Sequence, residues 1–336
     1  MAERWTLASS STSSYFSCLH PRHLNSAAPS TESNFPLAFS IIAYKNPDQL
    51  YRLLRVVYRP WNAYCIHLDR KADQAMLDML LTLTTCHGNI WMSGERYNVT
   101  WGDPSLLYAA LSCQSLLLSK STTWTYLLNI AASDFPLVSN LDIVRGLQSL
   151  NGSSDVQVTD SSFDSWKYKH SFANANGTAA AVEQFKLTLQ INGTFPTKPP
   201  PPFGLVIKKG SFSAALHRHF VHFLLTDTIA RTFLDYLSDT FIADEAYWST
   251  LYNRYLDMSQ EKYKEVEFRT RYTHWGTYQP SCSGYYEHGL CVFGVRDLKW
   301  LLKKAHGHFF AHKFDETVQP IALECLEEYL ANKTYS

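Results

Sequence analysis

Short apolar runs alternate with longer segments of helical periodicity in the amino-terminal half of the chain. The apolar runs are residues 38–44, 63–69, 89–92 and 124–130. The helical segments that follow them are residues 46–58, about 71–84, a segment opening at Asp103 and Pro104, and about 140–149. β-Branched runs of this length are typical of strands, so the alternation predicts βαβ units. We therefore expect an α/β fold with a mostly parallel central sheet flanked by helices.

The first of these helices carries a recognisable start signal. Asn46 is a candidate N-cap, Pro47 occupies the first helical position, and Gln49 would complete a capping box. These residues predict that a strand leads directly into a helix.

The regular alternation ends near residue 150. Apolar residues at Phe185, Leu187, Leu189 and Ile191 alternate as in a half-exposed strand, and the run KPPPPFG stiffens the chain after it. Helices are expected again at residues 213–223, 228–239, 244–256, 295–305 and 318–330.

Residues 1–34 are rich in serine and threonine, which predicts a disordered stem or linker before a single domain at residues 35–336. No apolar run approaches the ~18 residues of a membrane span, and no signal peptide is evident. If the protein works in a secretory lumen, its anchor is absent from this chain.

Lysine and arginine number 30, as do aspartate and glutamate, and no dense basic run occurs. This balance argues against a nucleic-acid partner. Five Asn-x-Ser/Thr triplets favour an oxidising, glycosylating compartment, whereas the seven cysteines lack the spacing of a zinc site. The triplets begin at Asn98, Asn151, Asn176, Asn192 and Asn332.

Ligands of open α/β sheets bind beyond the carboxyl ends of the strands. Those ends are here Ile42 to Tyr44, Asp69 and the loop around Trp101. The sequence contains neither GxGxxG nor GxxxxGK[ST], so neither a dinucleotide fingerprint nor a phosphate loop is present.

The stretch TFIADEAYWSTL places two acids at the start of a predicted helix. Asp244 is well placed as an N-cap, and Glu245 shares a helix face with Trp248 and Tyr252. Both acids could simply cap the helix, but a partly desolvated Glu245 would also suit a general base. GxSxG and HExxH are absent, and no second acid stands at a spacing that suggests a glycoside hydrolase.

Four separated motifs resemble the core 2 and I-branching β-1,6-N-acetylglucosaminyltransferases of glycosyltransferase family 14. They are FPLAFSIIAY, WTYLLNIAASDFPLV, ADEAYWSTL and CSGYYEHGLCVFGVRDLKWLL, and the similarity is collinear from about Phe35 to Leu330. The resemblance implies a GT-A-type fold and a type II membrane protein of the Golgi lumen. It also implies inverting, metal-independent transfer of N-acetylglucosamine from UDP-N-acetylglucosamine to the 6-hydroxyl of an acceptor sugar on O-glycans.

By this resemblance Glu245 is the catalytic base, with Ala243 replacing the proline of the family's Pro-Asp-Glu motif. The uridine-contacting positions fall on Ile42, Tyr44 and Asp69. Trp101 stands where the family has a tyrosine.

The family stabilises the leaving diphosphate with an arginine and a lysine. The lysine is Lys313, but the arginine is replaced by His288, which is only partly charged near neutral pH. Arg296 is a candidate compensating cation.

On the acceptor side, Trp275 matches a tryptophan that packs against the acceptor sugar, and Tyr278 matches a tyrosine if a one-residue gap is allowed. A lysine and an arginine that the family places before the tryptophan at Trp166 are here Ser162 and Ser165. The identity of the acceptor glycan therefore cannot be inferred from the family.

The family's disulfides imply the pairs Cys65–Cys113 and Cys282–Cys291, and Cys18 would pair with Cys86, leaving Cys325 over. Two alternatives stay open: a family member that transfers xylose or glucuronic acid, and a catalytically silent protein that binds carbohydrate or UDP.

Overall fold

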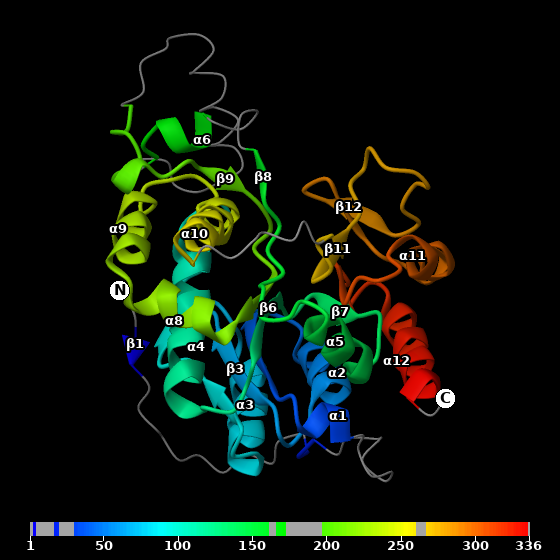
Figure 1. The fold of residues 1–336 in the computed structure, drawn as a ribbon. Coiled ribbons are helices and arrows are strands. Elements are labelled where there is room, and N and C mark those ends of the chain that lie inside the picture. Colours follow the sequence, from blue (N-terminus) through cyan, green and yellow to red (C-terminus); the bar gives the residue numbers. More distant parts are fainter. Residues whose placement is uncertain are drawn as a thin grey trace.

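A computed structural model describes residues 3–4, 17–19, 30–160, 166–172, 197–259 and 267–334. Its centre is a five-stranded sheet in the order β10-β6-β2-β3-β4 (Figure 1). These strands are β2 (Leu37–Ala43), β3 (Ala63–Leu68), β4 (Ile90–Met92), β6 (Tyr126–Ala131) and β10 (Ala214–His217).

Strand β2 is hydrogen-bonded in parallel to β3 on one side and to β6 on the other, and β3 continues in parallel to β4. Only β10, at the edge next to β6, runs antiparallel within this sheet. The predicted α/β class with a mostly parallel sheet flanked by helices is thus confirmed.

Helices cover both faces of the sheet, so that alternate residues of β2 enter two different apolar clusters. Phe39 and Ile41 pack in the cluster that contains α2, α3 and α5, whereas Ala38 and Ile42 pack in the cluster that contains α4 and α8. These helices are α2 (Pro47–Val57), α3 (Gln74–Cys86), α4 (Ser105–Lys120), α5 (Asn140–Gln148) and α8 (Arg218–Thr226).

Smaller elements surround the carboxyl ends of the parallel strands (Figure 1). One sheet joins β11 (Arg271–Thr273), β14 (Phe310–His312) and β7 (Asp134–Pro136). Two ribbons are β12 (Tyr285–Glu287) with β13 (Leu290–Val292) and β8 (Thr159–Asp160) with β9 (Lys208–Lys209). Further helices are α6 (Trp166–Lys169), η2 (Pro202–Gly204), α9 (Thr228–Tyr236), α10 (Asp244–Ser259), η3 (Val295–Asp297), α11 (Leu298–Lys304) and α12 (Pro320–Thr334).

The four strands predicted in the amino-terminal half are present, and each boundary lies within two residues of its predicted place. The helix predicted at 213–223 was partly wrong, because its first residues form strand β10 and helix α8 begins only at Arg218. Ala214 and Leu216 point into the core from an edge strand, an apolar pattern that a helix start shares. The strand predicted around Phe185 to Ile191 lies outside the described residues.

The capping box predicted at Asn46 was wrong. Asn46 has a left-handed backbone (φ 61°) and does not cap helix α2. Its side-chain amide instead donates to Asp315 at 3.0 Å, and the Gln49 amide donates to the Phe314 carbonyl at 3.0 Å. Both side chains therefore join the start of α2 to a distant carboxy-terminal segment.

The segment expected to be a stem contains some described structure. Helix α1 (Ser30–Ser33) belongs to the folded domain, and strand β1 (Glu3–Arg4) pairs with β5 (Glu95–Arg96). None of the helices in the described ranges has the length and apolarity that crossing a bilayer requires.

Three disulfides join Cys18 to Cys86, Cys65 to Cys113 and Cys282 to Cys291. These are the pairs named from the sequence. Cys325, on α12, is unpaired and half-buried.

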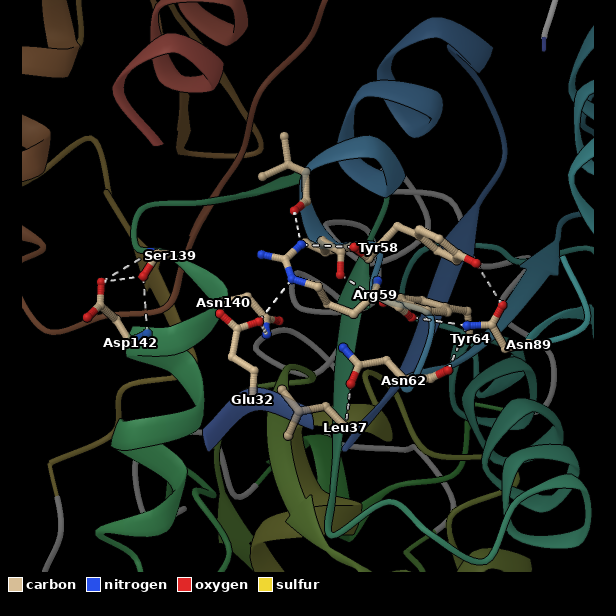
Figure 2. A network of polar contacts seen from close by, with 12 residues as sticks. Glu32, Leu37, Tyr58, Arg59, Asn62, Tyr64, Asn89, Ser139, Asn140 and Asp142 are labelled. Carbon is tan, nitrogen blue, oxygen red and sulfur yellow. Dashed lines mark hydrogen bonds and ion pairs between the residues drawn. The ribbon is translucent and has the colours of Figure 1, made fainter. Parts of the chain in front are cut away.

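A buried polar network closes the fold beneath the amino ends of the strands (Figure 2). Arg59 donates through Nε to Glu32 at 2.9 Å, and the Asn140 amide donates to the same carboxylate oxygen at 2.6 Å. The Asn62 side chain accepts from the Leu37 amide at 2.9 Å, which fixes the start of β2. The network thus links α1, the end of α2 and the start of α5.

Replacing Arg59 with Met should reduce the free energy of unfolding by about 3–5 kcal/mol, because Glu32 would stay buried without its cation. Urea denaturation measures this loss. The control is Glu324→Gln, which removes an exposed partner of Arg52 and should leave the midpoint nearly unchanged. Equal losses of unfolding free energy in the two variants would show that the buried Glu32–Arg59 pair contributes no more than an exposed one.

Candidate active site

A cavity of about 1480 Å³ lies beyond the carboxyl ends of β2, β3 and β6. The strand order reverses at β2, and such switch points are the usual ligand sites of open α/β sheets. The residues that the family resemblance placed in the donor and acceptor sites line this cavity, with the exception of the candidate cation Arg296. They are Ile42, Tyr44, Asp69, Trp101, Glu245, Trp275, Tyr278, His288 and Lys313.

Asp69, which follows β3, is buried and bound to the protein on both carboxylate oxygens. It accepts from the Lys71 amide at 2.7 Å, from the Lys71 ammonium at 3.0 Å and from the Val99 amide at 3.0 Å. Because these bonds hold the loop that leads to Trp101, Asp69 braces this wall of the cavity. Ile42 lies one residue before the end of β2, and the exposed Tyr44 directly follows the strand.

Trp101 and His288 come together although they lie in distant motifs. Their rings stack with centroids 5.5 Å apart and planes 10° apart. Trp101 also contacts the Phe241 ring edge-on at 5.3 Å. The stack joins the loop before α4 to the β12–β13 ribbon.

His288 lies in the tight turn of the β12–β13 hairpin. His288 and Gly289 both have left-handed backbones, with φ of 52° and 79°, as the favoured two-residue hairpin turns require. The hairpin is braced at its base by the Cys282–Cys291 disulfide and by the buried Asp297 carboxylate, which accepts from the amides of Ser283 at 2.8 Å and Gly294 at 2.8 Å.

Lys313 follows β14, and its carbonyl accepts from the Phe293 amide at 2.9 Å. Its ammonium forms an ion pair with the Glu287 carboxylate, a partner that the sequence did not predict. Arg296, the candidate compensating cation, is exposed and does not line the cavity, so that suggestion was wrong.

Glu245 lies in the first turn of α10 with 26% of its side chain exposed. Two lysines that the sequence did not predict flank its carboxylate: Lys167 Nζ lies 3.3 Å away and Lys209 Nζ 3.6 Å away. The two ammonium groups therefore place positive charge directly beside the Glu245 carboxylate. Lys167 comes from α6 and Lys209 from β9, so no local pattern could have placed them here.

Gly210 lets the β9 strand approach α10. Its amide donates to the Glu245 carbonyl at 2.7 Å. A Cβ atom at this position would lie 1.9 Å from the Gln157 carbonyl oxygen and 2.3 Å from the Ser249 hydroxyl. Only glycine fits in this contact, which therefore holds Lys209 beside Glu245.

Asp244 was predicted to cap α10, but it is the first residue of the helix. The carbonyl of Ala243, the residue before it, accepts the Tyr247 amide at 3.1 Å. Asp244 is buried, and burial, with a further contribution from the Glu245 charge, raises the pKa of its carboxyl group to about 7.

The turn before Asp244 is strained. Ile242 has a left-handed backbone with φ of 55°, which is rare for a β-branched residue. Its amide donates to the Gly102 carbonyl at 2.8 Å, so the strained turn is held against the Trp101 loop. The structure thereby connects the loop of the stacked Trp101 to the start of the helix that carries Glu245.

Trp275 and Tyr278 form an exposed aromatic edge of the cavity, with exposures of 43% and 45%. Trp275 lies against the β12–β13 hairpin, since it bridges to Leu290 and the next amide, from Gly276, donates to the Gly289 carbonyl at 2.9 Å. Exposed aromatic faces suit the carbon-bearing side of a sugar ring. Ser162 and Ser165, which replace two family residues, lie outside the described residues.

Among the described residues, one group of three potential metal ligands is found, namely Cys282, Cys291 and Asp297. Its two sulfur atoms are bonded to each other, so this donor set does not fit a metal ion. Of the five glycosylation triplets, Asn98, Asn151 and Asn332 are exposed, and Asn176 and Asn192 fall outside the described residues.

Comparison with known proteins gives consistent results. The family model "Branch: Core-2/I-Branching enzyme" matches residues 37–302. Zebrafish β-1,3-galactosyl-O-glycosyl-glycoprotein β-1,6-N-acetylglucosaminyltransferase 4 (Danio rerio) is 31% identical over 90% of this chain and 71% of its own. Human N-acetyllactosaminide β-1,6-N-acetylglucosaminyl-transferase is 32% identical over 88% of this chain and 72% of its own.

A solved structure, apo mouse xyloside xylosyltransferase 1, aligns with 83% of this chain and 96% of its own, at 10% identity and a TM-score of 0.33. That score is too low to bear on the fold. The match of the family model over most of the domain, with relatives above 30% identity, shows that the chain belongs to the Core-2/I-Branching enzyme family.

The raised pKa of Asp244 predicts a pH-dependent stability. Between its ordinary value of 3.8 and about 7, folded Asp244 keeps a proton that the unfolded chain has released, so its contribution to stability falls as pH rises through this window. Asp244→Asn cannot ionise. Its thermal midpoint relative to the parent should therefore rise between about pH 4 and about pH 8. A difference that stays constant with pH would contradict the assignment.

Gly210→Ala should destabilise the protein by about 1–3 kcal/mol, because the added methyl group collides with backbone at Gln157. Gly94→Ala is the matched control, since a Cβ atom there would meet nothing within 4 Å. Thermal unfolding of both variants measures the difference. Equal thermal midpoints for Gly210→Ala and Gly94→Ala would contradict the close contact between Gly210 and the Gln157 backbone.

Proposed function

We propose that this protein is an inverting β-1,6-N-acetylglucosaminyltransferase that acts without a metal ion. It would transfer N-acetylglucosamine from UDP-N-acetylglucosamine to the 6-hydroxyl of an acceptor sugar on O-glycans, as in core 2 branching. Family membership and the names of the relatives support this activity. One structural observation carries it furthest: Glu245 lies in the same cavity as Lys313 and His288.

In this proposal Glu245 is the general base. The acceptor 6-hydroxyl oxygen attacks the anomeric carbon, its proton passes to the Glu245 carboxylate, and the bond from the anomeric carbon to the UDP oxygen breaks. Attack on the face opposite the leaving group inverts the configuration. Lys167 and Lys209 lie beside the carboxylate and would orient it toward the incoming hydroxyl.

The leaving UDP carries the charge released by this step. Lys313 and His288 line the donor side of the cavity and would stabilise the diphosphate electrostatically. Ile42, Tyr44 and Asp69 lie at the strand ends where the uridine would bind, and Trp101 stacks on His288 beside them. Trp275 and Tyr278 would hold the acceptor sugar.

We place this reaction in the lumen of the Golgi. Three disulfides require an oxidising compartment, and three exposed glycosylation triplets suit the secretory pathway. Related family activities with xylose or glucuronic acid, and binding of UDP without turnover, are the alternatives that the assay below separates.

Glu245→Gln should reduce the transfer rate by about 10²–10⁴-fold, because the amide cannot accept the hydroxyl proton. Binding of UDP should be unchanged. The assay is mass-detected transfer from UDP-N-acetylglucosamine, UDP-xylose and UDP-glucuronic acid to Galβ1-3GalNAc, in EDTA. Glu328→Gln, which changes an exposed acid of α12, is the charge-matched control.

Full activity of Glu245→Gln would refute the role of the base. Activity that is lost in EDTA and restored by manganese would refute metal independence. Transfer of another sugar in preference would assign the donor to the xylose or glucuronic acid branch, and UDP binding without any transfer would favour the silent protein.

A further inference from the structure

Glu287 is an acidic residue inside the donor half of the cavity, where the proposed substrate is itself an anion. It ends strand β12, immediately before the His288 turn, and lines the cavity with His288 and Lys313. Its carboxylate contacts the Lys313 ammonium, with 37% of the Glu287 side chain and 15% of the Lys313 side chain exposed. Thus the lysine proposed to bind the diphosphate already has a carboxylate partner.

Other positive charges face the same carboxylate. The contact with Lys313 lowers the pKa of Glu287, and the charges of Lys45 and His288 add to this effect. Lys45 itself forms an ion pair with Asp315 at 3.0 Å. The Glu287 carboxylate therefore lies at a point of positive potential, surrounded by the groups that would attract a phosphate oxygen.

A carboxylate oxygen and a phosphate oxygen compete for the same ammonium hydrogens. Glu287 is partly exposed at the end of a hairpin strand, so its side chain can leave Lys313 by changing rotamer without unfolding the turn. The Lys313 side chain is the more buried of the two, with 15% exposed against 37% for Glu287. The acid is therefore the more exposed partner of this pair.

We propose that Glu287 is an internal competitor for the diphosphate: it neutralises Lys313 in this structure and is displaced when a nucleoside diphosphate binds. This inference rests on the proposed function. Glu287 would weaken the binding of diphosphate-bearing ligands and favour the departure of UDP after transfer. It would leave the affinity for the uncharged nucleoside unaffected.

Calorimetric titration of UDP and of uridine into the parent protein and Glu287→Gln tests this. The variant should bind UDP about fivefold more tightly, the effect of losing one partly exposed competing pair, while the affinity for uridine stays the same. The gain should shrink in high salt, which screens the charges. Glu324→Gln, which also removes an acid from an ion pair but lies outside the cavity, should show neither effect.

Thermal midpoints of both variants establish that they are folded, and Glu287→Ala, which also lacks the carboxylate, should reproduce the gain. Equal UDP affinity in the parent, Glu287→Gln and Glu324→Gln would overturn the inference and leave the donor site standing. If UDP binds neither the parent nor any variant, the proposed function itself is wrong. If manganese tightens UDP binding in the parent and Glu287→Gln abolishes this gain, Glu287 is a metal ligand and not a competitor.

Discussion

Parallel pairing of β2 with both β3 and β6 determines where this protein can bind a ligand. Helices cover both faces of the sheet, so a ligand can reach it only at the ends of the strands. At the amino ends the Glu32–Arg59 pair closes the fold around buried polar atoms. At the carboxyl ends the loops diverge and leave a large cavity. The amino ends of the strands thus hold a stabilising polar network, and the carboxyl ends hold the candidate site.

Charge balance is the second property that unifies the site. Cations that are partly removed from water need compensating anions, and the protein supplies them on both sides of the cavity. The pairs are Lys313 with Glu287, Lys45 with Asp315, and Lys167 and Lys209 with Glu245. If Glu287 is displaced as proposed, the binding of a diphosphate exchanges one anion for another at Lys313. On the other side Lys167 and Lys209 offset the charge of Glu245, the residue that we propose as the base.

The strands and most helices could be predicted because their signals are local: apolar runs mark buried strands, and the family motifs mark their ends. The site residues taken from those motifs do line one cavity. The errors and omissions arose where the conformation or partner of a side chain depends on a residue that is distant in the sequence. Gln49 bonds to a segment more than 260 residues away instead of capping its own helix. Lys167 reaches Glu245 across 78 residues and Glu287 reaches Lys313 across 26, and no periodicity reports such contacts.

The β12–β13 hairpin is stabilised within itself, through the Cys282–Cys291 disulfide and the Asp297 carboxylate. Its two-residue turn projects Glu287 and His288 into the cavity without contributing to the central sheet. A substitution of the partly exposed Glu287, which precedes the turn, can therefore alter the local potential at little cost to folding. The turn residues His288 and Gly289 are instead constrained by their left-handed backbones. The hairpin is therefore a separate unit, in which the charge beside Lys313 can change while the central sheet stays the same.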